Sequence, residues 1–268
     1  IMKQYLSFFR LRFTMGLQYR AAAFGGIATQ FAWGFMEIMI FAAFYRADAD
    51  AFPISFSATV SYLWLQQAFL ALFATWMMET EIFDSIVNGN IAYELCRPID
   101  IYSMWFFRSI ATRLSRAVLR CFPILIVAAL LPYPYGICAP ASPKHFILFG
   151  VTMILGLAMT VSLCVLIYIL AFFTISPAGL EMMFTSMTDF FAGALIPLPF
   201  FPERMRQLME LLPFAAMQNV PLRIYSGSMN GPEMQKAVLL QIFWLTVITA
   251  AGKILCHTAQ KRVIVQGG

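Results

Sequence analysis

The sequence predicts an all-α integral membrane protein, a single domain (1–268) with six transmembrane helices. Hydrophobic side chains make up 61% of the chain and charged ones only 12%, whereas roughly a quarter of residues in soluble proteins are charged. Several uncharged apolar runs approach or exceed the ~20 residues that a helix needs to cross ~30 Å of hydrocarbon. The strands of a β-barrel would instead alternate over ~10 residues. The runs therefore favour helices.

The first element expected is an amphipathic helix over residues 2–20. Lys3, Arg10, Arg12 and Arg20 alternate there with leucine, phenylalanine and tyrosine side chains. Such a helix lies in the membrane interface, with its cations on an anionic leaflet. We therefore place it on the cytoplasmic side.

Six spans follow, and their expected ranges are 21–45, 57–78, 102–131, 146–173, 179–195 and 234–258. The third is unusual, because its first half carries Arg108, Arg113, Arg116 and Arg120. Even numbers of spans put both termini on one side. Twelve of the eighteen Lys and Arg residues then fall on the side of the termini, and this bias predicts that both termini are cytoplasmic.

Residues 79–101 form the longest polar interruption on this cytoplasmic side. Ile82, Phe83, Ile86 and Val87 fall on one face of a short helix, and the glycine at position 89 favours its end. A second apolar turn runs from Ile91 to Leu95 and stops at Arg97-Pro98. The segment is either a docking element for a partner or an amphipathic helix on the headgroups.

Residues 197–221 follow the fifth span and cannot form a continuous helix. Pro197, Pro199 and Pro202 remove three backbone donors within six residues. Non-helical backbone at membrane depth needs a lined cavity or surrounding protein. The segment is thus expected to re-enter the membrane from outside, with a peripheral extracellular hairpin as the alternative.

No residues with the spacing of a catalytic, metal or nucleotide site appear in the sequence. The two histidines lie at span ends, and the five cysteines lack metal-ligand spacing. There is no glycine loop that would cradle phosphates. We expect a chain without catalytic residues, metal or cofactor of its own, and we assign the net charge of +5 to membrane orientation and not to nucleic acid.

Charged residues inside the predicted spans are the remaining signal. Arg113, Arg116 and Arg120 share one helix face, which should face protein because lipid exposure is costly. Depth counted at ~1.5 Å per residue from each helix start matches Arg120 with Glu37 and Arg116 with Asp189. The charges are either structural pairs or a polar track for a substrate.

Two stretches carry a family resemblance. The residues Asn88-Gly89-Asn90-Ile91, Leu95 and Arg97-Pro98, together with Gly193 to Pro202 and Leu212-Pro213, resemble the cytoplasmic loop and the extracellular segment of ABC transporter type-2 permeases. The resemblance implies a permease that exports a substrate across the cytoplasmic membrane of a prokaryote. It also implies a second permease, the same or related, and two separate ATP-binding subunits that hold ATP and Mg.

In this family residues 79–101 would form the coupling segment. The resemblance implies that the ATP-binding subunit contacts Ile82, Phe83, Ile86, Gly89, Ile91, Leu95, Arg97 and Pro98. It also implies an outer gate at Pro197, Phe200, Phe201 and Pro202. Aromatic and methionine-rich spans suit a hydrophobic cargo such as a drug, peptide or lipid, and they suit contact with membrane lipid equally well. The alternative function is a membrane-embedded enzyme or an ion-conducting subunit without ATPase partners.

Overall fold

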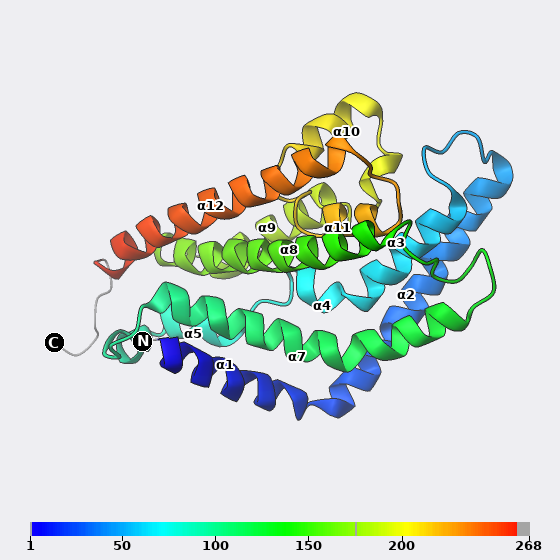
Figure 1. The fold of residues 1–268 in the computed structure, drawn as a ribbon. Helices are drawn as coiled ribbons and strands as arrows, with labels where there is room; N and C mark the ends of the chain where they lie inside the picture. Colours follow the sequence, from blue (N-terminus) through cyan, green and yellow to red (C-terminus); the bar gives the residue numbers. More distant parts are fainter. Residues whose placement is uncertain (1, 175, 262–268) are drawn as a thin grey trace.

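The computed structural model describes residues 2–174 and 176–261, and within these ranges the chain forms helices and turns without a strand. Figure 1 shows the long helices extending across the molecule, with the segment around α5 and the region around α10 at opposite ends. The elements are α1 (Met2–Leu17), α2 (Arg20–Ala47), α3 (Phe56–Ala68), α4 (Leu70–Phe73), α5 (Thr80–Val87), α6 (Ile91–Leu95), α7 (Ile101–Leu130), α8 (Pro143–Leu170), η1 (Ala171–Phe173), α9 (Pro177–Phe191), η2 (Leu198–Phe200), α10 (Glu203–Glu210), α11 (Asn219–Tyr225) and α12 (Pro232–Gln260).

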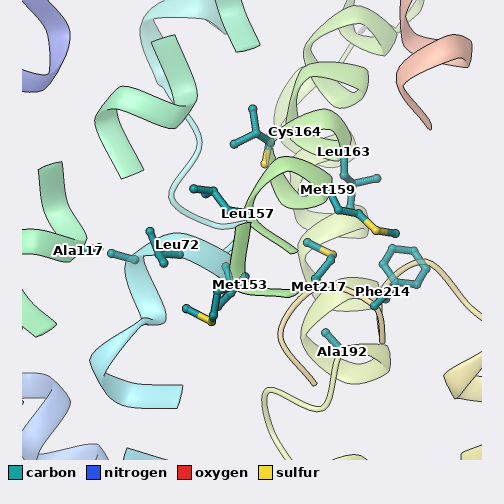
Figure 2. Packing of buried hydrophobic residues seen from close by; sticks show 14 of the residues in the cluster. Leu72, Ala117, Met153, Leu157, Met159, Leu163, Cys164, Ala192, Phe214 and Met217 are labelled. Carbon is teal, nitrogen blue, oxygen red and sulfur yellow. The ribbon is translucent and has the colours of Figure 1, made fainter. Parts of the chain in front are cut away.

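Among the described residues, three helices are long and apolar enough to cross a membrane: α2, α8 continued by η1, and α12. In their most apolar stretches 72% of α8 is buried inside the protein, against 28% of α2 and 17% of α12. The helix α8 is therefore central, and Figure 2 shows its Met153 and Leu157 in the core with Leu72 and Met217. The helices α2 and α12 instead present large exposed apolar side chains, such as Met39 and Leu239, on the outside of the bundle.

Capping residues fix where four of the helices begin. The side chains of Ser55, Asp100, Ser142 and Ser176 accept hydrogen bonds from backbone N–H groups in the first turns of α3, α7, α8 and α9. Prolines occupy the first position of α8, α9 and α12, where the missing N–H costs nothing. These helices consequently start one to three residues before the expected ranges.

The second span differs from the continuous helix expected over 57–78. The helix is interrupted at Phe69 and ends at Phe73, and residues 74–79 are not helical. The guanidinium of Arg113 donates to the carbonyls of Leu72 at 3.2 Å and Ala74 at 2.8 Å. Since these acceptors lie at the end of α4, a buried arginine from α7 satisfies backbone groups that a longer helix would have satisfied itself.

The fifth helix also ends early, at Phe191 and not at Leu195, where Gly193 adopts a φ of +73°. The chain then passes through η2 and α10 and returns into the bundle as α11, whose Leu222 and Ile224 are fully buried. A side chain on Gly156 of α8 would meet the Met217 carbonyl at 2.2 Å. The absence of a side chain on this glycine thus lets the returning backbone lie directly against the central helix.

The helix α1 packs lengthwise along the first half of α7 (Figure 1). The Tyr5 ring stacks on Phe107 with centroids 5.4 Å apart, and the Tyr5 hydroxyl accepts a hydrogen bond from the Asp100 N–H at 3.2 Å. At the other end of α1, a side chain on Gly16 would meet the Ser115 hydroxyl at 2.1 Å. The arginine-rich half of α7 is therefore covered by α1.

Candidate functional site

The coupling segment, residues 79–101, is fastened to two of the long helices. Arg108 of α7, only 4% exposed, donates to the Glu79 carboxylate at 2.5 Å and also pairs with Glu81. The Glu79 N–H donates to the Tyr168 hydroxyl of α8 at 2.7 Å. The Trp105 indole N–H donates to Glu94 at 2.9 Å. These bonds tie both short helices of the segment to α7 and α8, so the segment and the two helices are expected to move together.

The apolar face of the segment is turned into the chain and not toward solvent. Ile82, Phe83 and Ile91 are buried in the main hydrophobic core, where the Phe83 ring meets Tyr168 at 5.0 Å. Ile86 and Leu95 are half-buried against the same core. The contact of Ile82, Phe83 and Ile91 with a partner stays a prediction, and in this structure the same face packs on the protein's own helices.

The exposed surface of the segment consists of other residues. Val87 is 64% and Tyr93 75% exposed, and Cys96, Arg97 and Pro98 are exposed beside them. Gly89 is half-buried, with a φ of +73° and nothing near its Cα that a side chain would meet. Sequence reasoning missed Tyr93, because one aromatic side chain in a five-residue helix leaves no periodic signal.

An open cavity of about 450 Å³ lies between α2, the α3–α4 break and α9. Trp33, Phe73 and Trp76 contribute aromatic walls, and Glu37, Asp189 and Arg120 also line it. Several buried polar side chains in its wall have side-chain atoms without a hydrogen-bond partner in the described chain, namely Gln30, Gln66, Thr188 and Gln218. Because unpaired buried amides are costly, this wall is suited to a ligand with hydrogen-bonding groups.

The two expected ion pairs do not form. Among the described residues Glu37 accepts only a hydrogen bond from Gln67 at 3.2 Å, and the side chains of Arg116 and Asp189 line different cavities. Arg120 lies against Gly26 of α2, eleven residues before Glu37 and thus about 16 Å away along the helix. Depth counted from the helix starts matched the wrong residues. The first half of α7 runs beside α1, so α7 begins well before α2 does and the same residue count reaches a different height in each helix.

A family model for the ABC-2 family of transporter proteins matches residues 31–266. The chain belongs to this family. A comparison with curated proteins finds no match. ABC-2 proteins are multi-pass membrane subunits of ABC transporters and work with ATP-binding subunits, so this chain is a permease subunit of such a transporter. The coupling segment lies within the matched residues, and so do most residues that line the cavity, except Gly26, Thr29 and Gln30.

In this ABC-2 permease the residues expected to gate the outer mouth are packed against their own chain. The Phe200 ring meets Phe41 of α2 at 4.8 Å, and the Phe201 ring meets Phe190 of α9 at 5.7 Å. Pro197 is buried, whereas Pro202 is exposed. The two phenylalanines are half-buried, so they offer only part of their surface to a second molecule. The apolar side chains most exposed here are instead Leu195 and Leu208, at 69% and 68%.

Proposed function

We propose that the chain is the permease half of an ATP-driven exporter in the cytoplasmic membrane of a prokaryote. It pairs with a second permease, the same or related, and with two separate ATP-binding subunits, which supply ATP and Mg. Six spans would be formed by α2, α3 with α4, α7, α8 with η1, α9 and α12. Both termini and the coupling segment would then be cytoplasmic, in keeping with the excess of Lys and Arg on that side.

The observation that carries the proposal is the double attachment of the coupling segment. Arg108 binds its start to α7, and Tyr168 binds the same start to α8, while Val87 and Tyr93 stay exposed. A rigid element with one face in the membrane domain and another face open can pass the closure of a soluble ATPase to the membrane helices as a rigid-body movement.

The lining of the cavity between α2 and α9 favours an amphiphilic cargo. Aromatic walls favour apolar groups, and the unpartnered amides of Gln30 and Gln218 favour groups that donate or accept hydrogen bonds. The cavity lies beside the segment from Gly193 to Pro221, which we propose as the re-entrant outer boundary of the path. Its exposed Leu195 and Leu208 would meet the second permease.

The test is association with the ATP-binding subunit after removal of the exposed side chains. Val87→Ala with Tyr93→Ala should weaken binding by about tenfold or more, because a buried aromatic anchor commonly contributes more than ~1 kcal/mol at an interface. Leu130→Ala, 79% exposed at the far end of α7, is the matched control and should leave binding unchanged. Equal binding of all three proteins would refute docking at this segment.

A further inference from the structure

A second cavity of about 420 Å³ lies where α1 meets α2, beside α7 and the start of α5. Arg12 of α1 and Arg116 and Arg120 of α7 line it, together with Glu79, Thr80 and Glu81 of the coupling segment. Close packing gives the cavity its shape. Gly16 permits contact between α1 and α7, and Gly26 leaves the room on α2 that the Arg120 guanidinium occupies.

The charges around this cavity do not balance. Both carboxylates, Glu79 and Glu81, are taken by Arg108, and Arg12 reaches Glu81 only at 3.6 Å. Arg116 and Arg120 form neither an ion pair nor a hydrogen bond with any described residue, and the Nε of Arg120 is buried without a partner. Four guanidinium groups therefore face two carboxylates. Arg113, the other cation on this part of α7, does not line the cavity. Its guanidinium donates to the backbone carbonyls of Leu72 and Ala74.

Half-buried arginines without an anion are costly, and the planar guanidinium with its several donors matches phosphate geometry. The charge surplus thus favours an anionic oxygen group such as a phosphate. Met15, Met78 and Leu119 also line the cavity. These side chains suit a ligand whose phosphate continues into an apolar part.

The depth of the cavity indicates where such a phosphate comes from. The helix α2 has 28 residues and is about 42 Å long, some 12 Å more than the ~30 Å of hydrocarbon. Shared equally between the two ends, this excess of ~6 Å per end places the first turn of α2 at headgroup depth, and this turn carries Ala22 and Ala23 at the cavity. Tyr19, 70% exposed at the start of α2, is the residue type that anchors at this level.

We infer that this cavity binds the phosphate of an anionic phospholipid headgroup, with Arg116 and Arg120 as the main contacts and Arg12 at its rim. The inference requires only that the chain is embedded in a bilayer, and it does not depend on the proposed export. Because Glu79 to Glu81 line the same cavity, a bound headgroup would lie directly beside the start of the coupling segment.

Lipid retention by the purified full chain tests this inference. The protein is exchanged into mixed micelles with equal amounts of phosphatidylglycerol and phosphatidylcholine, and bound lipid is counted by native mass spectrometry. Wild-type protein should retain phosphatidylglycerol preferentially. Arg116→Gln with Arg120→Gln should lower this preference by about tenfold, and Arg116→Lys with Arg120→Lys should keep part of it because the charges remain.

The matched control is Arg10→Gln, which removes an exposed cation from α1 without touching the cavity, and it should retain the full preference. An equal loss in Arg10→Gln would mean diffuse surface attraction and would overturn the inference. An unchanged preference in the double Gln variant would also overturn it. Displacement of the lipid by an equal concentration of glycerol phosphate would identify a site for free anions and not for lipid. If the double Gln variant does not fold, Arg12→Gln alone should still reduce the preference, and its failure to do so would contradict the site.

Discussion

At each end of the molecule a buried arginine pairs with two glutamates, but the two arginines connect different numbers of elements. At one end Arg108 of α7 binds Glu79 and Glu81, and at the other Arg223 of α11 binds Glu210 at 2.5 Å and Glu233 at 2.7 Å. Both arginines are only 4% exposed. Arg223 joins three separate elements, α10, α11 and α12, whereas Arg108 joins α7 to the start of α5 alone.

The charged groups around these two arginines differ in whether they find partners within the chain. Around Arg223, the neighbouring Arg206 is itself paired with Glu203 and Glu210, so the charges complete one another within the chain. Around Arg108, Arg116 and Arg120 remain without partners, and Val87 and Tyr93 are exposed. The charged groups at the α10 end thus pair with one another, whereas among the described residues at the α5 end two arginines stay unpaired.

The largest expected effect follows from removing the two buried arginines in turn. Arg223→Gln leaves Glu210 and Glu233 without their buried partner and should cost ~3–5 kcal/mol of unfolding free energy. Arg108→Gln should cost more, because it leaves the Glu79 carboxylate unpaired at only 11% exposure, whereas Glu210 and Glu233 are 27% and 45% exposed and water can partly replace their partner. The measurement is the unfolding midpoint in one detergent for both variants. Equal losses would break the comparison between the two ends.

Much of this architecture could be predicted from the sequence. The helix expected at 102–131 is present as α7, Ile101–Leu130, because a capping aspartate and a proline-rich loop mark its ends. The break at Phe73 could not be predicted, since it depends on Arg113, forty residues later. The short helix expected after position 79 is present as α5, whereas the burial of its apolar face against the chain's own core was not foreseen. Amphipathic spacing identifies an apolar face and does not say which protein covers it.

An intermediate effect is expected where the returning chain touches α8. Gly156→Val would drive a side chain into the Met217 carbonyl and should cost ~1–3 kcal/mol through overpacking. Gly150→Val, on the same helix with nothing within 4 Å of a new Cβ, is the control. Thermal unfolding of the two variants separates the contact from the general cost of replacing a helical glycine by valine. A cost at position 150 as large as at 156 would show that the close approach is unimportant.

The smallest effect concerns Glu37 and Arg120, which line one cavity without pairing. Glu37→Gln keeps an acceptor for the Gln67 amide, so it should change stability by less than ~1 kcal/mol. The double variant with Arg120→Gln should show additive losses within ~0.5 kcal/mol, as for separate sites. Recovery of stability in the double variant relative to Arg120→Gln would instead indicate a direct pair.

The α5 end is the one that we propose to receive the ATP-binding subunit, and its most direct test uses cysteines that the chain already has. Cys96 is exposed in the coupling segment, just before α7, and Cys138 is half-buried in the loop after α7, at the other end of that helix, while Cys121, Cys164 and Cys256 are buried. A membrane-impermeant maleimide is applied to inside-out and right-side-out vesicles, with Cys96→Ser as the control. We expect Cys96 to react only from the cytoplasmic face and to be protected when the ATP-binding subunit is present, with Cys138 unaffected by that subunit. Reaction of Cys96 from outside, or equal reaction with and without the subunit, would contradict the assignment of this end as the surface that receives it.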